Sequence, residues 1–216
     1  MSETTFRVLS FDPGNNLGFA VVEFDYPNFT KAKVLVVNTL DVDKYINHYF
    51  DDDLINNHAK VAIRGLAIGT NIGILGNKWE PDFICHETAF SAHGRKQFGN
   101  SIESFACLRE CILSIKFGAI NFDRDVKVCE INPNTVKYCL MDHRSSDKSE
   151  IKNAVIGNDE IDLTNIQCDD LEYLDQHSWD AIAIAYTFIK KKVMGVPKIE
   201  HPAPRKNPKK RKTVRP

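Results

Sequence analysis

Three carboxylates stand where predicted strands end or where a predicted helix begins. Asp12 ends the first apolar run, Glu87 ends a later one, and Asp180 lies in the opening turns of the last helical segment. If these segments converge, their oxygens are the ligands that Mg²⁺ prefers. Two such ions, about 3.5–4 Å apart, can activate water and stabilise the leaving 3′ oxygen of a phosphodiester. Taken singly, each acid also fits a turn, a solvated strand end or a helix start.

The elements that would position these acids follow from apolar alternation and from turn residues. A strand, a tight turn at Pro13-Gly14-Asn15-Asn16 and an antiparallel partner open the chain, and a third strand follows a turn at Tyr26-Pro27-Asn28. Helices are predicted near 53–77 and over 101–117, the second ending at Gly118. The sequence predicts five strands, at 6–12, 17–24, 33–39, 82–87 and 126–131.

The C-terminal half is predicted to be helical. Asn132-Pro133 is typical of an N-cap followed by proline in the first helical position, and Asp147 to Glu150 fits a capping box. Two short helices are expected after these signals. A last helix is predicted from Ser178 to Lys192, with His177 near its start.

Length and composition favour one α/β domain. The 216 residues include 43% apolar residues, enough for a packed core. No stretch approaches the roughly 18 apolar residues of a membrane span. The N-terminus also lacks the basic-then-apolar layout of a signal peptide. We therefore expect a soluble intracellular protein with no membrane partner.

The charge is segregated although the formal net charge is -1. Eleven of the 28 Lys and Arg residues lie from Lys190 onward, where Glu200 is the one acid. We expect a folded domain over 1–192 and a flexible basic tail over 193–216. Such a tail can neutralise phosphates and offset the acidic body. It contains Lys209, Lys210, Arg211 and Lys212, a run that also fits a nuclear address in a eukaryotic host.

The order of the motifs resembles the RuvC family of Holliday junction resolvases, which have an RNase H-like fold. The likeness rests on five stretches within residues 6 to about 190: Leu9 to Gly14 with Gly18, Ile84 to Phe90, Thr135 to Lys137, Asp147 to Ser149, and Asp180 to Ala185. It implies a mixed five-stranded sheet flanked by helices, with Asp12, Glu87 and Asp180 as the catalytic, metal-binding carboxylates. Two Mg²⁺ ions per active site are implied, with Mn²⁺ able to substitute.

One position departs from the family pattern. The family commonly has a further Asp three residues before its last acid, and His177 stands there in this chain. Because positions i and i+3 share a helical face, His177 is a candidate metal ligand or proton relay. Asp175 is the rival fourth group, and a plain helix-start histidine is the structural alternative.

The resemblance also implies contacts with branched DNA. Phe90 matches an aromatic wedge that unstacks bases, although it could equally be a core residue. Lys137 and Lys148 match basic positions near the scissile phosphate, and Arg95 and Lys96 lie in a basic loop after the wedge. The family works as homodimers, for which helix 101–117 is the candidate interface.

Two classes of function remain open at this point. The first is a metal-dependent endonuclease that cuts four-way junctions and other branched DNA. The second is a catalytically impaired accessory protein that binds branched DNA with the same fold. A sugar-kinase or actin-like ATPase is disfavoured, because no second glycine-rich phosphate loop follows and 216 residues are too few for paired domains. No nucleotide cofactor is expected.

Overall fold

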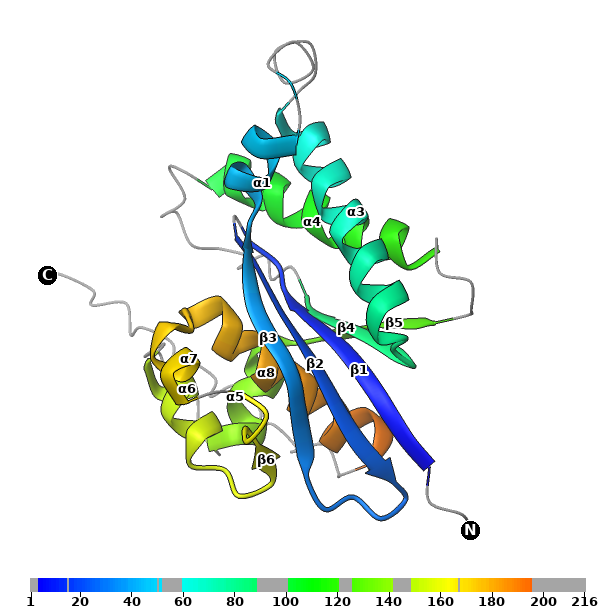
Figure 1. Ribbon diagram of the computed structural model, residues 1–216, viewed down its shortest axis with the longest axis vertical. Helices are drawn as coiled ribbons and strands as arrows, with labels where there is room; N and C mark the ends of the chain where they lie inside the picture. Colours follow the sequence, from blue (N-terminus) through cyan, green and yellow to red (C-terminus); the bar gives the residue numbers. More distant parts are fainter. Residues whose placement is uncertain are drawn as a thin grey trace, which may run out of the picture.

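A computed structural model describes residues 4–14, 16–49, 51, 60–88, 101–120, 126–141, 149–166 and 168–195. Its strands form one mixed sheet in the order β5-β4-β1-β2-β3-β6 (Figure 1). The strands are β1 (Thr4–Asp12), β2 (Asn16–Tyr26), β3 (Ala32–Asp41), β4 (Phe83–Glu87), β5 (Lys127–Ile131) and β6 (Ile161–Asp162).

Helices cover both faces of this sheet (Figure 1). One face carries α1 (Val42–Tyr49), α3 (Lys60–Trp79) and α4 (Ser101–Ile120). The opposite side carries α5 (Pro133–Met141), α6 (Ser149–Ile156), α7 (Cys168–Tyr173) and α8 (Gln176–Phe188), with a π-helical turn over Ile189–Val193. None of the helices in the described part of the chain is both long and apolar enough to span a membrane.

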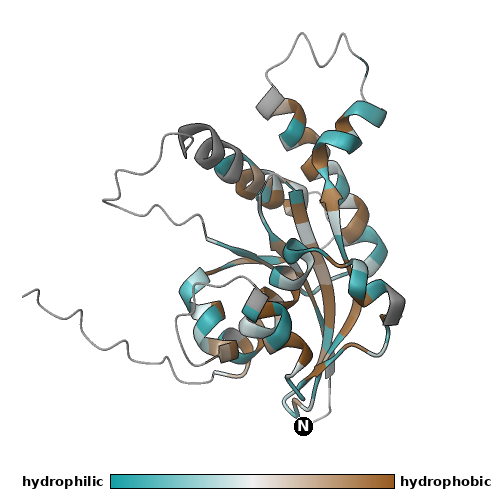
Figure 2. Ribbon diagram, turned by 90° about the vertical axis from the view of Figure 1, so that its left-hand side faces the viewer, coloured by the Kyte–Doolittle hydropathy of each residue, from teal (hydrophilic) through white to brown (hydrophobic). Residues whose placement is uncertain are grey.

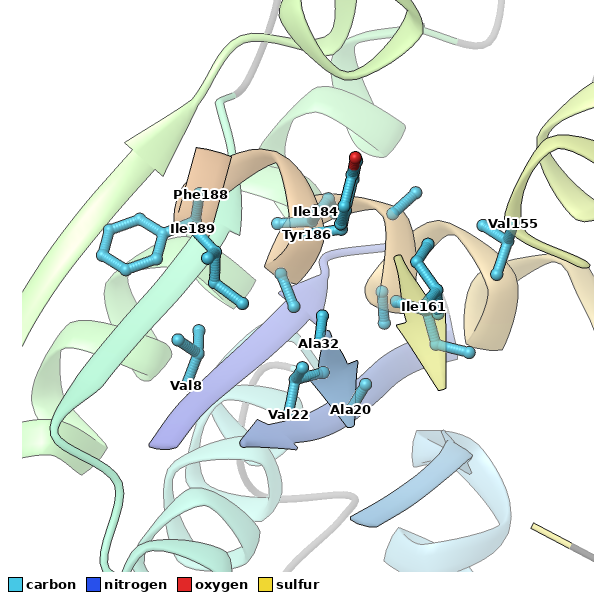
Figure 3. Packing of buried hydrophobic residues seen from close by; sticks show 14 of the residues in the cluster. Val8, Ala20, Val22, Ala32, Val155, Ile161, Ile184, Tyr186, Phe188 and Ile189 are labelled. Carbon is cyan, nitrogen blue, oxygen red and sulfur yellow. The ribbon is translucent and has the colours of Figure 1, made fainter. Parts of the chain in front are cut away.

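The alternation of β1 divides the core into two layers. Val8 packs with α8, whereas Leu9 and Phe11 pack with α3 and α4. Figure 3 shows the first layer, where Ile184 and Phe188 of α8 lie over the sheet. Apolar colour accordingly concentrates where strands and helices face one another (Figure 2). Burial on both faces makes the sheet a rigid base for side chains at its edge.

The predicted fold class and the five predicted strands are confirmed, with ends shifted by a few residues. The sheet also has a sixth strand, β6, that the sequence did not predict. Its two residues pair in parallel with Ala32 and Lys33 and are too short to show alternation. Helices α1 and α7 were missed as well, because each is only six to eight residues long and short helices are hard to separate from loops by pattern alone.

The predicted end of the 101–117 helix was wrong. Gly118 lies inside α4, which continues to Ile120. Its role is packing, because a Cβ at Gly118 would stand 2.8 Å from Ile72 Cγ2 and 3.1 Å from the Gly69 carbonyl oxygen of α3. The two helices therefore approach closely at this glycine. The predicted cap at Asn132 is confirmed, since its side chain accepts a 2.9 Å hydrogen bond from the Asn134 amide.

Candidate active site

The carboxyl ends of β1 and β4 meet at one edge of the sheet because these strands are parallel. Their register ends with Phe11 opposite His86, so the next residues, Asp12 and Glu87, emerge together. Alternation turns both side chains toward the face that α8 covers. Asp12 is buried and Glu87 is half-buried. Two acids far apart in the chain thus reach one edge.

Helix α8 brings the remaining two predicted groups to the same edge. It begins at Gln176, so His177 and Asp180 lie in its first two turns and share one face. The helix is held against β1 by Ser10, whose hydroxyl donates a 2.8 Å hydrogen bond to the Ala181 carbonyl. The side-chain amide of Gln176 donates a 2.9 Å hydrogen bond from Nε2 to Asp180 Oδ1, which orients that carboxylate.

His177 is in direct contact with Asp12. Its Nδ1 donates to Asp12 Oδ2 at 2.6 Å. This hydrogen bond is the largest cause that raises the pKa of His177, and the negative charges of Asp12, Asp175 and Asp180 add to it. Partial burial of the ring opposes the rise. The geometry therefore joins the histidine and the β1 carboxylate into one unit.

Asp175, the rival fourth group, has a different place. It is the N-cap of α8, where its Oδ1 accepts from the Ser178 amide at 2.9 Å and from the Thr39 hydroxyl at 2.6 Å. Burial opposes ionisation of Asp175, but these hydrogen bonds hold its pKa below the usual value. Asp175 thus links the start of α8 to β3. Of the two candidates for the fourth group, His177 lines the active-site cavity.

Four of the predicted site residues line one cavity of about 320 Å³: Asp12, Glu87, His177 and Asp180. Lys137 of α5 lines it as well, as the resemblance implied for a basic position near the phosphate. Its other walls are Pro13, Pro133, Val136, Ile151 and Ile184. The cavity lining therefore combines carboxylates, a histidine and a lysine with proline, valine and isoleucine side chains.

The donor chemistry of this cavity fits Mg²⁺. Within the described part of the chain, no three Asp, Glu, His or Cys side chains form a ready-made metal site. Mg²⁺ needs no such cage, since it keeps several waters and is often held by one or two carboxylates together with substrate phosphates. The cavity has room for a hydrated ion, because a water molecule occupies about 30 Å³. Asp12, Glu87 and Asp180 are the groups that would hold it.

Sequence reasoning missed the residues that fix this geometry. A Cβ on Gly18 of β2 would stand 2.2 Å from the His177 carbonyl oxygen. The start of α8 can therefore pack this closely against β2 only because residue 18 has no side chain. Gly18 was visible as part of the Asp-Pro-Gly-x-x-x-Gly pattern, although its partner was not. Nothing in the sequence indicates the partners of Thr39 and Ser10, which are Asp175 at the start of α8 and Ala181 within it, each more than 130 residues away.

Most of the predicted DNA contacts lie outside the described residues. These are Phe90, Arg95, Lys96, Lys148, Lys209, Lys210, Arg211 and Lys212. Lys137 is the one predicted DNA-binding residue whose position the structure describes.

The strand order and the helices on both faces of the sheet give an RNase H-like fold, which is similar to that of RuvC. No family model and no curated protein matches the chain. Solved structures do match: Thermus thermophilus RuvC has a TM-score of 0.60 at 20% identity, over 89% of this chain and 97% of that chain. The same protein in complex with Holliday junction substrate gives the same figures. The yeast mitochondrial Holliday junction resolvase Ydc2 has a TM-score of 0.63 at 13% identity, over 88% and 80%.

Proposed function

We propose that this protein is a Mg²⁺-dependent endodeoxyribonuclease that resolves four-way junctions and possesses activity on other branched DNA. The observation that carries this proposal is the convergence of Asp12, Glu87, His177 and Asp180 on one cavity. The fold that positions them is shared with a protein solved on Holliday junction substrate. Fold likeness by itself would not assign an activity, so the site is what supports it.

Each group of the cavity has a role in this proposal. Asp12, Glu87 and Asp180 hold two divalent ions, which would supply Lewis-acid stabilisation of the charge on the phosphodiester. His177 donates to Asp12 and fixes that carboxylate. Lys137, which also lines the cavity, offers a cation to the phosphate.

Mapped nicking of branched substrates tests this function. Purified protein is incubated with labelled four-way, Y-shaped and linear duplex DNA in Mg²⁺, in Mn²⁺ and in chelator. We expect paired nicks in the four-way junction with either metal, none in chelator, and little cutting of linear duplex. Equal cutting of linear duplex, or cutting in chelator, would contradict the proposal.

A catalytically impaired DNA-binding protein is the second candidate function. His177 favours it, because the family commonly has Asp at this position. The same assay separates the two functions. A retained gel shift without any product in Mg²⁺ or Mn²⁺ would establish the binding protein.

We further propose that the protein acts as a homodimer through α4 and the adjoining surface of α3. Leu113, Phe117 and Ile120 of α4 recur at helical spacing and are exposed, with Phe117 at 68% and Ile120 at 75%. Leu66 and Ile74 of α3 are exposed as well. Large apolar side chains that are exposed on two packed helices favour an interaction surface here. A second copy would place two active sites on one junction.

Charges placed on this face should separate the dimer. We expect the double substitution Phe117→Glu and Ile120→Glu to raise the dimer dissociation constant by at least about 100-fold, because large apolar anchors dominate such interfaces. Sedimentation equilibrium measures the mass over a concentration series. The control is Ile156→Glu, an equally simple change at an exposed isoleucine on α6. A dimeric mass for the α4 variant would disprove this interface.

The basic tail is proposed to bind phosphates without sequence preference. If five of its cations contact DNA, deleting residues 196–216 should flatten the slope of log affinity against log salt by about 4.5, because each contact releases condensed counterions. Fluorescence anisotropy with a labelled four-way junction over a salt series measures the slope. A tail of the same composition in scrambled order should restore it. An unchanged slope after deletion would show that the tail does not contact DNA.

A further inference from the structure

A buried histidine lies next to the candidate catalytic carboxylate of β4. His86 has no exposed surface. By alternation it lies on the same side of the strand as Ile84, which packs into the layer beneath α3 and α4. A polar ring in this apolar layer carries a desolvation cost that another isoleucine would not. A hydrogen bond made by the ring would offset this desolvation cost and would explain why a histidine occupies the position.

The ring of His86 is bonded to the residue that follows it. Its Nδ1 lies 2.9 Å from the Glu87 carbonyl oxygen. A carbonyl oxygen can only accept, so Nδ1 carries the proton and donates it. Among the described residues the other ring nitrogen, Nε2, has no hydrogen-bond partner, and it stands 4.0 Å from Glu130 Oε1. Nδ1 is thus the polar atom of this ring that makes a bond.

This bond acts where β4 stops pairing with β1, although β4 still pairs with β5 as far as Glu87 opposite Ile131. Pairing of β1 with β4 ends at Phe11 opposite His86, one residue before Glu87. On the side of β4 that faces β5, the Thr88 backbone amide donates a 2.9 Å hydrogen bond to the Ile131 carbonyl. The His86 ring adds a second hydrogen bond to the peptide group between Glu87 and Thr88, at its carbonyl oxygen. The orientation of that peptide determines where the Glu87 side chain points into the cavity.

We propose that His86 is a positioning residue for Glu87. Its Nδ1–H fixes the Glu87 carbonyl and through it the carboxylate that would hold the metal. This inference rests on the proposed function, since Glu87 is a metal ligand in that proposal. Groups that hydrogen-bond to metal-binding residues typically change metal affinity or activity 10–100-fold when they are removed.

Three substitutions in the full chain separate positioning from packing. His86→Asn offers an amide N–H close to the place of Nδ1, His86→Gln offers one near Nε2, and His86→Leu offers none. The readouts are the Mn²⁺ dissociation constant by calorimetry, and single-turnover cleavage and binding of a four-way junction. We expect Mn²⁺ binding and the cleavage rate to fall about 10–100-fold in the Gln and Leu variants. The Asn variant should stay within about threefold of the native protein, and junction affinity in chelator should not change.

Equal Mn²⁺ affinities for the native, Gln and Leu proteins would overturn the positioning role. If the Leu variant does not fold, the Mn²⁺ affinities of the Asn and Gln variants test the positioning role. Both variants bury an amide group, so they differ mainly in where that group can donate a hydrogen bond. A native protein that cuts no DNA would refute the proposed function alone. The Mn²⁺ affinities of the variants would still test His86, because that measurement needs no cleavage.

Discussion

Asp180→Asn should abolish junction cleavage while junction binding survives. The substitution keeps the size of the side chain and removes the charge that would hold a divalent ion on the α8 wall of the cavity. We expect the single-turnover rate in Mg²⁺ to fall by at least about 10³-fold, since charge stabilisation of the phosphodiester is lost. Junction affinity in chelator should stay within about twofold. Asp12→Asn and Glu87→Gln should behave in the same way.

The matched control for this experiment is Asp159→Asn. Asp159 is an exposed carboxylate on the turn before β6 and does not line the cavity. It loses the same charge as Asp180, so nicking should continue at the native rate. Denaturant unfolding of both variants shows whether either has lost its fold. Full nicking by Asp180→Asn in Mg²⁺ would refute the assignment of the three carboxylates.

Gly18→Ala is expected to have the second-largest effect, although it adds only one methyl group and changes no charge. The new Cβ would stand 2.2 Å from the His177 carbonyl oxygen and 2.5 Å from its carbonyl carbon. Backbone atoms cannot swing away as a side-chain end can, so the start of α8 must shift. We expect a loss of about 2–3 kcal/mol in the free energy of unfolding. Because His177 and Asp180 move with the helix, cleavage should fall by about 10²-fold or more.

The control for Gly18 is Gly73→Ala on α3. A Cβ at Gly73 would meet nothing within 4 Å, and alanine is the better helix former. This variant should gain up to about 1 kcal/mol and cut DNA at the native rate. Urea unfolding and single-turnover cleavage measure both variants. Native stability and activity in Gly18→Ala would show that β2 and α8 do not approach as closely as described.

Local patterns made much of this fold predictable. Alternation located five strands, and Asn132 with Pro133 marked the start of α5. The same patterns placed Asp12 and Glu87 at strand ends. Parallel pairing of β1 with β4 then brings such ends to one edge of the sheet. The convergence of the acids therefore followed from local signals and a known topology.

Features that depend on two distant segments could not be predicted from the sequence. Gly118 resembled a helix end because its packing partner, Ile72, lies on another helix. Thr39 gave no sign of its bond to Asp175, which joins β3 to the start of α8. The choice between His177 and Asp175 at the cavity also depended on where α8 begins. Local sequence indicates which helices and strands form, whereas contacts such as these depend on how those elements pack together in the fold.

Helix α8, the last α-helix among the described residues, supplies half of the four side chains that gather at the cavity. His177 and Asp180 both lie on α8, after every strand of the sheet has been made. A polypeptide still emerging from the ribosome therefore holds Asp12 and Glu87 without their partners. Under the proposed function, a nascent chain that ends before residue 176 would therefore lack the α8 half of the site.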